Sequence, residues 1–295
     1  MRIFITGSSG FIGKNLLNKL INSNHEILIS YNKTNIKFPN CNVVKYNIGD
    51  RINSKINSFE PEILIHLAWE NIPDFSYSQS IINMEKNILF LNAISEIKSL
   101  NKIIVTGSCL EYGSFNGKCK ENFISKPNSY FSFAKKSIYN FLEILCVEKK
   151  IDYVWFRVFY VYGMFQRKDS IIPNIFNKLL YKNDLRIKYP YNKNDYVYVD
   201  DVVDAIILSI KKSKINSILN IGSGKITSVL SLVKKIENKL SINKDFSNYL
   251  MTKSQKSNLL YKKADILLSK KILNWSPKFT IDQGIDHLIK NYYSK

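Results

Sequence analysis

The sequence predicts an α/β protein built on a doubly wound parallel sheet, with a smaller C-terminal lobe that binds the substrate. Short apolar strands alternate with helices over about the first 160 residues, which is typical of a parallel sheet with helices on both faces. Residues 63–67 form an almost wholly apolar strand, as expected where helices cover both faces of a sheet. In addition, the chain opens with a strand, a glycine-rich turn and a helix.

The first thirty residues are the most informative stretch. Residues 2–6 are expected to form a strand, residues 14–21 a helix and residues 26–30 a second strand. Between the first strand and the helix lie Gly7, Gly10 and Gly13. The first glycine permits a tight turn, the second lets backbone N–H groups approach a pyrophosphate, and the third allows the helix to pack closely on the strand. This order predicts a dinucleotide-binding unit.

The rest of the chain continues the alternation and then loosens after Gly163. Further strands are expected at 42–47, 63–67, 102–106 and 153–158, with helices at 83–99 and 130–148 and a polar loop at 112–128. Beyond Gly163 we expect helices at 171–181, 202–211, 228–240, 263–272 and 282–292, and strands at 185–188, 196–199 and 218–221. The pair Asp200-Asp201 is expected to cap the helix at 202–211.

This pattern divides the chain into two predicted parts. Residues 1–163 form a dinucleotide-binding Rossmann domain, to which residues 195–222 return. Residues 164–194 and 223–295 form the smaller lobe, which faces the carboxyl ends of the strands, where such sheets bind their ligands.

Composition narrows the class of protein. The chain has 295 residues and 45% hydrophobic content, and no apolar run reaches the roughly 18 residues of a membrane helix. The N-terminus enters a strand directly, and the four cysteines form no CxxC pair. We therefore expect a cytoplasmic protein without a metal site, disulfide framework or membrane association.

The formal charge of +19 indicates an affinity for anions. Lysines are spread along the chain, without an arginine-rich block or a nucleic-acid recognition module. Nucleic-acid binding is therefore not expected, and attraction of a diphosphate substrate is the more useful interpretation.

A series of motifs then carries a family resemblance over nearly the whole chain. They are TGSSGFIG at 6–13, HLAW at 66–69, Asn87, VTGSCLEYG at 105–113, Lys135, RVFYVYG at 157–163, NDYVYVDDV at 194–202, NIGSG at 220–224 and LNWSPKFTIDQGI at 273–285. In this order they resemble the extended short-chain dehydrogenase/reductase family, in its nucleotide-sugar epimerase/dehydratase/reductase branch. The resemblance implies a nicotinamide cofactor, a nucleotide-diphosphate sugar as substrate, and a homodimer formed through the helices at 83–99 and 130–148.

The resemblance also implies roles for individual residues. Ser108 would hydrogen-bond the substrate oxygen that gains or loses a proton, and Lys135 would bind the nicotinamide ribose. The cofactor would be bound by Gly7, Ser9, Gly10, Phe11, Ile12, Gly13, Tyr31, Asn32, Lys33, Asn47, Ile48, Leu67, Ala68, Trp69, Asn87, Thr106, Lys135 and Phe159. The substrate would be bound by Ser108, Cys109, Glu111, Tyr160, Arg167 and Asn194.

One position departs from the family pattern. The family lysine normally follows a tyrosine by one helical turn and lowers the pKa of its phenol, but the residue four before Lys135 is Phe131. Three explanations remain open. Tyr130 takes over through a shifted first turn; Tyr112, Cys109, Glu111 or a water donates the proton; or the protein binds its cofactor without turnover.

The type of reaction follows from what the motifs lack. Dehydratases of the branch carry an Asp-Glu pair after the serine, where this chain has Cys109-Leu110. Base-driven 3,5-epimerisation uses a Cys and a His, whereas all three histidines, at 25, 66 and 287, are expected to be structural. Hydride transfer at C4 remains, most simply a keto-reductase of a deoxysugar or heptose for surface polysaccharide. The alternatives are a 4-epimerase with tightly bound NAD and a non-catalytic NAD(P)H-binding protein.

The residues expected to bind the adenosine of the cofactor and the diphosphate of the substrate also depart from the family pattern. NAD-dependent relatives end the second strand with an aspartate, where this chain has Tyr31, followed by Asn32 and Lys33. The cofactor is therefore expected to be NADP(H) or NAD(H), with NADP(H) favoured. Asn47 stands where an Asp usually holds the adenine amine, and its amide oxygen can accept the same bond. On the substrate side, Tyr160 and Asn194 replace an Asn and an Arg. The missing charge is expected to come from Arg167, Lys168, Lys188 or Lys193, although a lysine is a point charge without the bidentate fork of an arginine.

Overall fold

The computed structural model describes residues 1–33, 38–181, 187–242, 246 and 261–293. Its centre is a seven-stranded, wholly parallel sheet with the order β11-β7-β5-β4-β1-β2-β3. The strands are β1 (Arg2–Thr6), β2 (Glu26–Tyr31), β3 (Asn42–Lys45), β4 (Ile63–His66), β5 (Lys102–Ser108), β7 (Asp152–Val158) and β11 (Asn216–Ile221). Because the chain starts in the middle of the sheet and winds to both edges, the doubly wound Rossmann-like prediction is confirmed.

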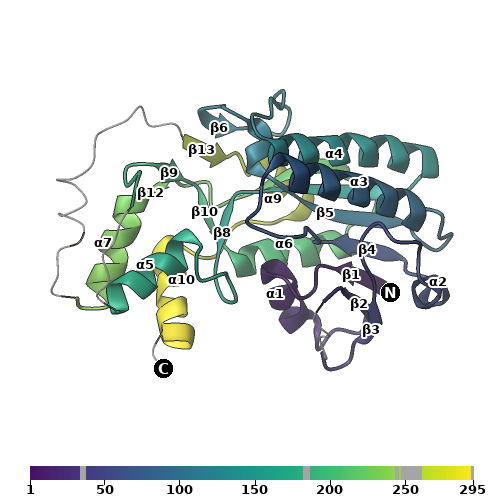
Figure 1. Ribbon diagram of the computed structural model, residues 1–295, viewed down its shortest axis with the longest axis horizontal. Helices are drawn as coiled ribbons and strands as arrows, with labels where there is room; N and C mark the ends of the chain where they lie inside the picture. The colour runs from purple at the N-terminus through teal and green to yellow at the C-terminus, as the bar shows by residue number, and fades with distance from the viewer. Residues whose placement is uncertain (34–37, 182–186, 243–245, 247–260, 294–295) are drawn as a thin grey trace.

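Helices cover both faces of this sheet (Figure 1). Alternate strand residues point to opposite sides, so Ile3 and Ile5 enter one core and Phe4 enters the other. One face packs against α1 (Phe11–Leu20) and α6 (Val199–Lys211). The other packs against α3 (Tyr77–Ile94) and α4 (Tyr130–Lys149), with the short α2 (Ser54–Phe59) beside them.

The second half of the chain adds two small sheets. Strands β8 (Tyr160–Tyr162) and β10 (Tyr196–Tyr198) pair in parallel. The other sheet has the order β12-β9-β13-β6, from β12 (Thr227–Ser228), β9 (Lys193–Asn194), β13 (Tyr261–Ala264) and β6 (Gly117–Cys119). The helices of this region are α5 (Ile171–Leu180), α7 (Val229–Lys239), α9 (Leu267–Leu273) and α10 (Ile281–Leu288). The division into a Rossmann domain and a smaller lobe stays a prediction.

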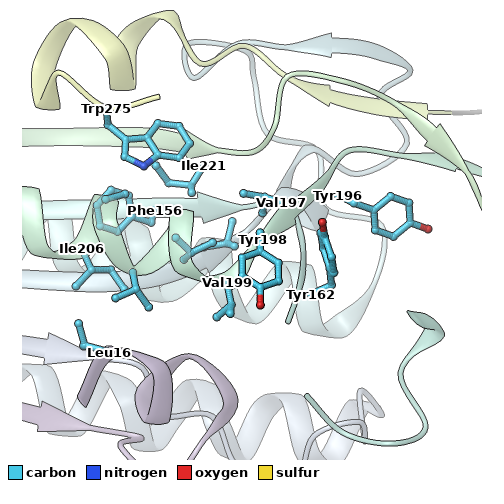
Figure 2. Packing of buried hydrophobic residues seen from close by; sticks show 14 of the residues in the cluster. Leu16, Phe156, Tyr162, Tyr196, Val197, Tyr198, Val199, Ile206, Ile221 and Trp275 are labelled. Carbon is cyan, nitrogen blue, oxygen red and sulfur yellow. The ribbon is translucent and has the colours of Figure 1, made fainter. Parts of the chain in front are cut away.

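Aromatic side chains pack strand β8 against β10 and the C-terminal segment against α6 (Figure 2). The rings of Tyr162 and Tyr198 meet edge to face, with centroids 5.3 Å apart. Trp275 is buried beside α6, where its indole N–H donates to the backbone oxygen of Asp201 at 2.9 Å. The late motifs therefore anchor the C-terminal segment to the Rossmann sheet.

Four sequence predictions of local structure are corrected. The Asp200-Asp201 pair does not cap α6, which begins at Val199; instead the Asp201 carboxylate accepts the backbone N–H groups of Lys278 and Phe279. The predicted loop 112–128 contains η1 (Cys109–Tyr112) at its start and strand β6, and the predicted helix at 263–272 begins as strand β13. The helix expected at 83–99 starts six residues earlier, at Tyr77, because the Ser76 hydroxyl accepts the N–H of Gln79.

Other boundaries differ by a few residues. The C-terminal helix α10 continues as a π-helical turn, η2 (Ile289–Tyr293). The strand expected at 185–188 lies partly outside the described residues, and Ile187 and Lys188 are not in a strand. Within the described part of the chain, every helix is too short or too polar to span a lipid bilayer.

Candidate active site

A cavity of about 360 Å³ opens beyond the carboxyl ends of β1, β2 and β4. Most of the predicted cofactor residues line it, which brings together four segments that are far apart in the sequence. The lining residues from that prediction are Gly7, Ser9, Gly10, Phe11, Ile12, Gly13, Tyr31, Asn32, Ile48, Leu67, Ala68 and Trp69.

Two of the three glycines are required by close backbone approach. Gly7 has φ +71°, and a Cβ there would lie 2.6 Å from the backbone nitrogen of Ala68. A Cβ on Gly13 would lie 2.3 Å from the carbonyl oxygen of Gly7. Gly10 is less constrained, since a Cβ placed there would lie 3.1 Å from the carbonyl oxygen of Gly7. The turn after β1 is therefore pressed between α1 and the end of β4.

The cavity fits a dinucleotide on two further observations. The N-terminus of α1 borders it, and Gly10 at the N-cap provides no capping side chain, so the first-turn N–H groups are free to bind an anion. Two buried polar atoms beside it, Asn47 Oδ1 and Trp69 Nε1, have no hydrogen-bond partner among the described residues. Unpartnered buried atoms of this kind are rare in proteins and indicate a missing ligand or water.

Lys135 lies at the centre of an aromatic group near the cavity. Its ammonium is buried, donates to the carbonyl oxygen of Thr106 at 3.0 Å and lies 4.4 Å from the ring centre of Trp69. Burial lowers the pKa of Lys135 to about 8, although the Glu111 carboxylate favours the charged form. Phe131 lies one helical turn earlier. Its ring centroid is 5.0 Å from that of Trp69 and 4.6 Å from that of Phe75.

Ser108 is positioned by Glu111. The serine ends β5, its backbone N–H donates to Glu111 Oε1 at 2.8 Å, and its hydroxyl accepts the N–H of Leu110 at 3.1 Å. The fully buried Glu111 also accepts from the Trp155 indole and from Arg157 Nε at 3.0 Å. Glu111 is therefore the anchor of a buried ion pair and does not reach the cavity as a substrate ligand or proton donor.

The other proton donors suggested by the sequence, Tyr130, Tyr112 and Cys109, contact other parts of the protein or are buried. Tyr130 is 55% exposed and packs edge-on against Tyr77, and its place five residues before Lys135 puts it on a different side of α4. The Tyr112 hydroxyl donates to Asn220 Oδ1 at 2.8 Å, and burial raises its pKa. Cys109 is buried, which raises the pKa of its thiol. None of these three side chains lines the cavity.

Three of the predicted cofactor residues, Asn87, Phe159 and Lys33, do not line the cavity. Asn87 accepts from the ring of His66, whose other nitrogen lies 2.6 Å from the Thr6 hydroxyl. Burial lowers the pKa of His66 to about 4, so the ring is neutral and structural. Phe159 belongs to a small core with Cys109 and Tyr112, and Lys33 is exposed and does not line the cavity.

The predicted substrate residues on the second half of the chain lie apart from the cofactor cavity. Tyr160 packs against Tyr196, and Asn194 donates to the Tyr196 hydroxyl at 3.2 Å. Arg167 binds Asp169 through Nε at 3.0 Å, while its buried Nη1 has no partner among the described residues. The free guanidinium nitrogen is suited to an anion, as predicted for a diphosphate.

Five further residues line the cavity that were not predicted from the sequence: Ser30, Tyr46, Glu70, Ile72 and Val161. Ser30 and Tyr46 each adjoin a predicted residue, so strand ends were the available signal. Glu70 directly follows the HLAW motif, so its position next to predicted cofactor residues could also have identified it. Val161 had no comparable signal, since it comes from β8 in the second half of the chain.

Together, the sheet order, the glycine turn and the cavity at the switch point of the strands define a dinucleotide-binding α/β protein of the dehydrogenase/reductase type. The family model described as the NAD dependent epimerase/dehydratase family matches residues 3–222. The chain belongs to this family.

Individual relatives span several reactions. A dTDP-D-glucose 4,6-dehydratase of Dictyostelium discoideum is 30% identical over 80% of this chain, which spans 62% of that relative's length. A dTDP-4-dehydro-6-deoxyglucose reductase of Escherichia coli is 25% identical, with 99% of this chain and 98% of the relative covered. The structure of a UDP-glucose 4-epimerase of Thermotoga maritima with UDP-glucose superposes with a TM-score of 0.86 at 25% identity, over 100% of this chain and 99% of that one.

Proposed function

We propose that this protein is a nicotinamide-dependent reductase of nucleotide-4-keto sugars, acting at C4 in the synthesis of a deoxysugar or heptose for surface polysaccharide. The proposal rests on one observation, the phenylalanine at position 131. Phe131 lies one turn from Lys135, both contact the Trp69 ring, and Phe131 has no proton to exchange. Tyr130 lies on a different side of α4, so no phenol on this turn of the helix replaces it.

The missing phenol affects hydride transfer in both directions by the same factor, because the group that would take the proton in oxidation is the group that would return it in reduction. Oxidation of a sugar alcohol needs a base that removes the hydroxyl proton, and 4-epimerisation begins with that step. Reduction of a 4-keto sugar by a reduced nicotinamide is energetically favourable near neutral pH, and water can supply the proton that the alkoxide takes up. Epimerisation has to begin with the unfavourable oxidation, which leaves it more dependent on a positioned base. The site is therefore better suited to reduction than to epimerisation.

The residues of the chain have the following roles in this proposal. A bound nicotinamide cofactor supplies the hydride-transfer chemistry. The glycine turn and the N-terminus of α1 bind its pyrophosphate, and Asn47 Oδ1 accepts the adenine amine. Ser108 orients the C4 oxygen, and the Lys135 ammonium binds the nicotinamide ribose and stabilises negative charge near that oxygen. Arg167, whose Nη1 has no partner among the described residues, pairs with the substrate diphosphate, and Tyr160 and Asn194 contact the rest of the substrate.

We also propose a homodimer. Helices α3 and α4 lie side by side along one side of the molecule (Figure 1). They expose large apolar side chains, namely Tyr77, Leu89, Phe133, Ile144 and Val147 at 51–75%. A second copy of these two helices would cover them, since exposed apolar patches of this kind mark association surfaces. A cytoplasmic location stays a prediction.

The test is a comparison of both directions in wild type and Phe131→Tyr. With dTDP-4-dehydro-6-deoxyglucose, the substrate named for the E. coli relative, wild type should oxidise reduced cofactor, followed by its absorbance, and yield the 4-hydroxy product by mass. We expect Phe131→Tyr to change kcat/KM for reduction and for oxidation of the alcohol by the same factor, less than about threefold, because water already supplies the proton in wild type and one enzyme cannot alter the equilibrium between ketone and alcohol. Phe133→Tyr is the matched control, since Phe133 lies on the same helix and is exposed.

Three other outcomes would replace the proposal. Interconversion of C4 epimers by wild type without added reduced cofactor would identify a 4-epimerase. A large gain in reduction by Phe131→Tyr would indicate a degenerate site. Cofactor binding without turnover of any 4-keto sugar would favour the non-catalytic alternative.

A further inference from the structure

The end of β2 lacks the carboxylate with which related folds bind the adenosine ribose, but another carboxylate occupies the same place. Tyr31 ends the strand and Asn32 follows it, and both line the cavity. Glu70 also lines the cavity, although it comes from the connection between β4 and α3, 38 residues further along the chain. The Asn32 amide donates to Glu70 Oε1 at 3.2 Å, which places the carboxylate beside the end of β2.

The backbone of Glu70 is fixed by α3. Its N–H donates to Asn83 Oδ1 at 2.8 Å, and its carbonyl oxygen accepts from Asn83 Nδ2 at 3.3 Å. Asn83 is buried and also bonds the carbonyl oxygen of Gln79 at 2.9 Å. Glu70 is thus held in place before any ligand binds, which lowers the entropy cost of using it for binding.

The side chain of Glu70 is held on its other oxygen. Lys86 Nζ lies 2.8 Å from Glu70 Oε2, and Lys86 packs against Gly49, where a Cβ would lie 2.9 Å from Cγ of the lysine. Lys86 does not line the cavity, whereas Glu70 does. The carboxylate therefore stands between the lysine and the cavity, and an incoming ligand meets the negative group first.

From this arrangement we propose that Glu70 reads the adenosine ribose of the cofactor and selects NAD(H) over NADP(H). This inference rests on the proposed binding of a nicotinamide cofactor in the cavity. The carboxylate accepts the ribose hydroxyls, as an Asp or Glu at the end of the second strand does in other dinucleotide-binding folds. A 2′-phosphate would bring two like charges together at the same place. Lys33, which favoured NADP(H) in the sequence, is exposed and outside the cavity lining.

The test measures dissociation constants of NADH and NADPH by fluorescence titration, without substrate. We expect wild type to bind NADH at least about 30-fold more tightly than NADPH, and Glu70→Gln to bring the two within about threefold by weakening NADH and tightening NADPH. The matched control is Glu85→Gln, which makes the same charge change at an exposed position on α3. Glu85→Gln should leave the ratio of the NADPH and NADH dissociation constants unchanged.

A second variant, Lys86→Gln, separates the two members of the ion pair. If Glu70 sets the preference, this variant still favours NADH. If wild type favours NADPH and Lys86→Gln loses that preference, the lysine binds the phosphate and the inference is overturned. Equal ratios in wild type and Glu70→Gln would also overturn it. Failure of wild type to bind either nucleotide would instead refute the proposed cofactor site itself.

Discussion

Glu111 holds the turn that carries Ser108, and Glu111→Gln tests how strongly the buried ion pair supports this part of the site. The Glu111 side chain is 0% exposed and the side chain of its partner, Arg157, is 1% exposed. The carboxylate accepts from three donors: the Ser108 backbone N–H, the Trp155 indole and Arg157 Nε. An amide has one acceptor oxygen and adds two N–H donors of its own, so at least one of the three donors would lose its partner.

The expected magnitude follows from burial. Removing one member of a buried ion pair costs about 3–5 kcal/mol, because the other charge remains without compensation. The guanidinium of Arg157 keeps its bond to the backbone oxygen of Glu121 and its contact with the Tyr112 ring, which do not neutralise it. We therefore expect the free energy of unfolding to fall by about 4 kcal/mol, a large share of the ~5–15 kcal/mol typical of a folded domain.

Urea unfolding at neutral pH, followed by tryptophan fluorescence, measures this change. Glu96→Gln is the control, because Glu96 pairs with Lys149 at 2.8 Å on the surface, with side chains 65% and 29% exposed. Surface pairs contribute at most about 1 kcal/mol. A loss in Glu111→Gln of less than about 1 kcal/mol, or one equal to that of the control, would show that the buried pair does not support the fold as argued.

Two further predictions concern acid stability and assembly. His66 has a pKa of about 4 in the folded protein and an ordinary value of 6.5 when unfolded, so the unfolded chain binds more protons between these values. Stability should therefore fall by up to about 3 kcal/mol as the pH drops through that window, and His66→Gln should lack this loss; equal pH profiles for the two proteins would contradict the assignment. For assembly, sedimentation velocity should show a dimer for wild type and a monomer for Ile144→Glu, whereas Ile124→Glu, at an 83% exposed site outside α3 and α4, should stay dimeric. A monomeric wild type would rule out the proposed interface.

Much of the fold was open to prediction from the sequence. Strand and helix periodicity located all seven strands of the central sheet, and glycine spacing predicted the tight turn that Gly7 and Gly13 make. Most residues that line the cavity were named too, from the family resemblance that the sequence motifs carry. The strands and the turn are local: each depends on a few neighbouring residues whose backbone preferences and hydrophobic pattern are written in order along the chain.

The sequence alone left the proton donor open, and the structure narrowed the choice. Tyr130 through a shifted first turn, or Tyr112, Cys109, Glu111 or a water, were all open as donors, as was a protein without turnover. Helix orientation turns Tyr130 outward, and burial commits Glu111 to Arg157, 46 residues away. The first fact depends on how α4 packs beside α3, and the second on β7 lying next to β5 in the sheet.

The sequence by itself determined the strand–turn–helix order and the parallel sheet, because apolar periodicity and glycine positions act over one or two turns of chain. Only the tertiary structure decided that Glu70 reaches the end of β2, that β6 pairs with β13, and that Asp201 binds the N–H groups of Lys278 and Phe279. These contacts join segments between 38 and 145 residues apart. Their partners are chosen by sheet order and by the need to pair every buried polar group, and both are properties of the folded chain as a whole.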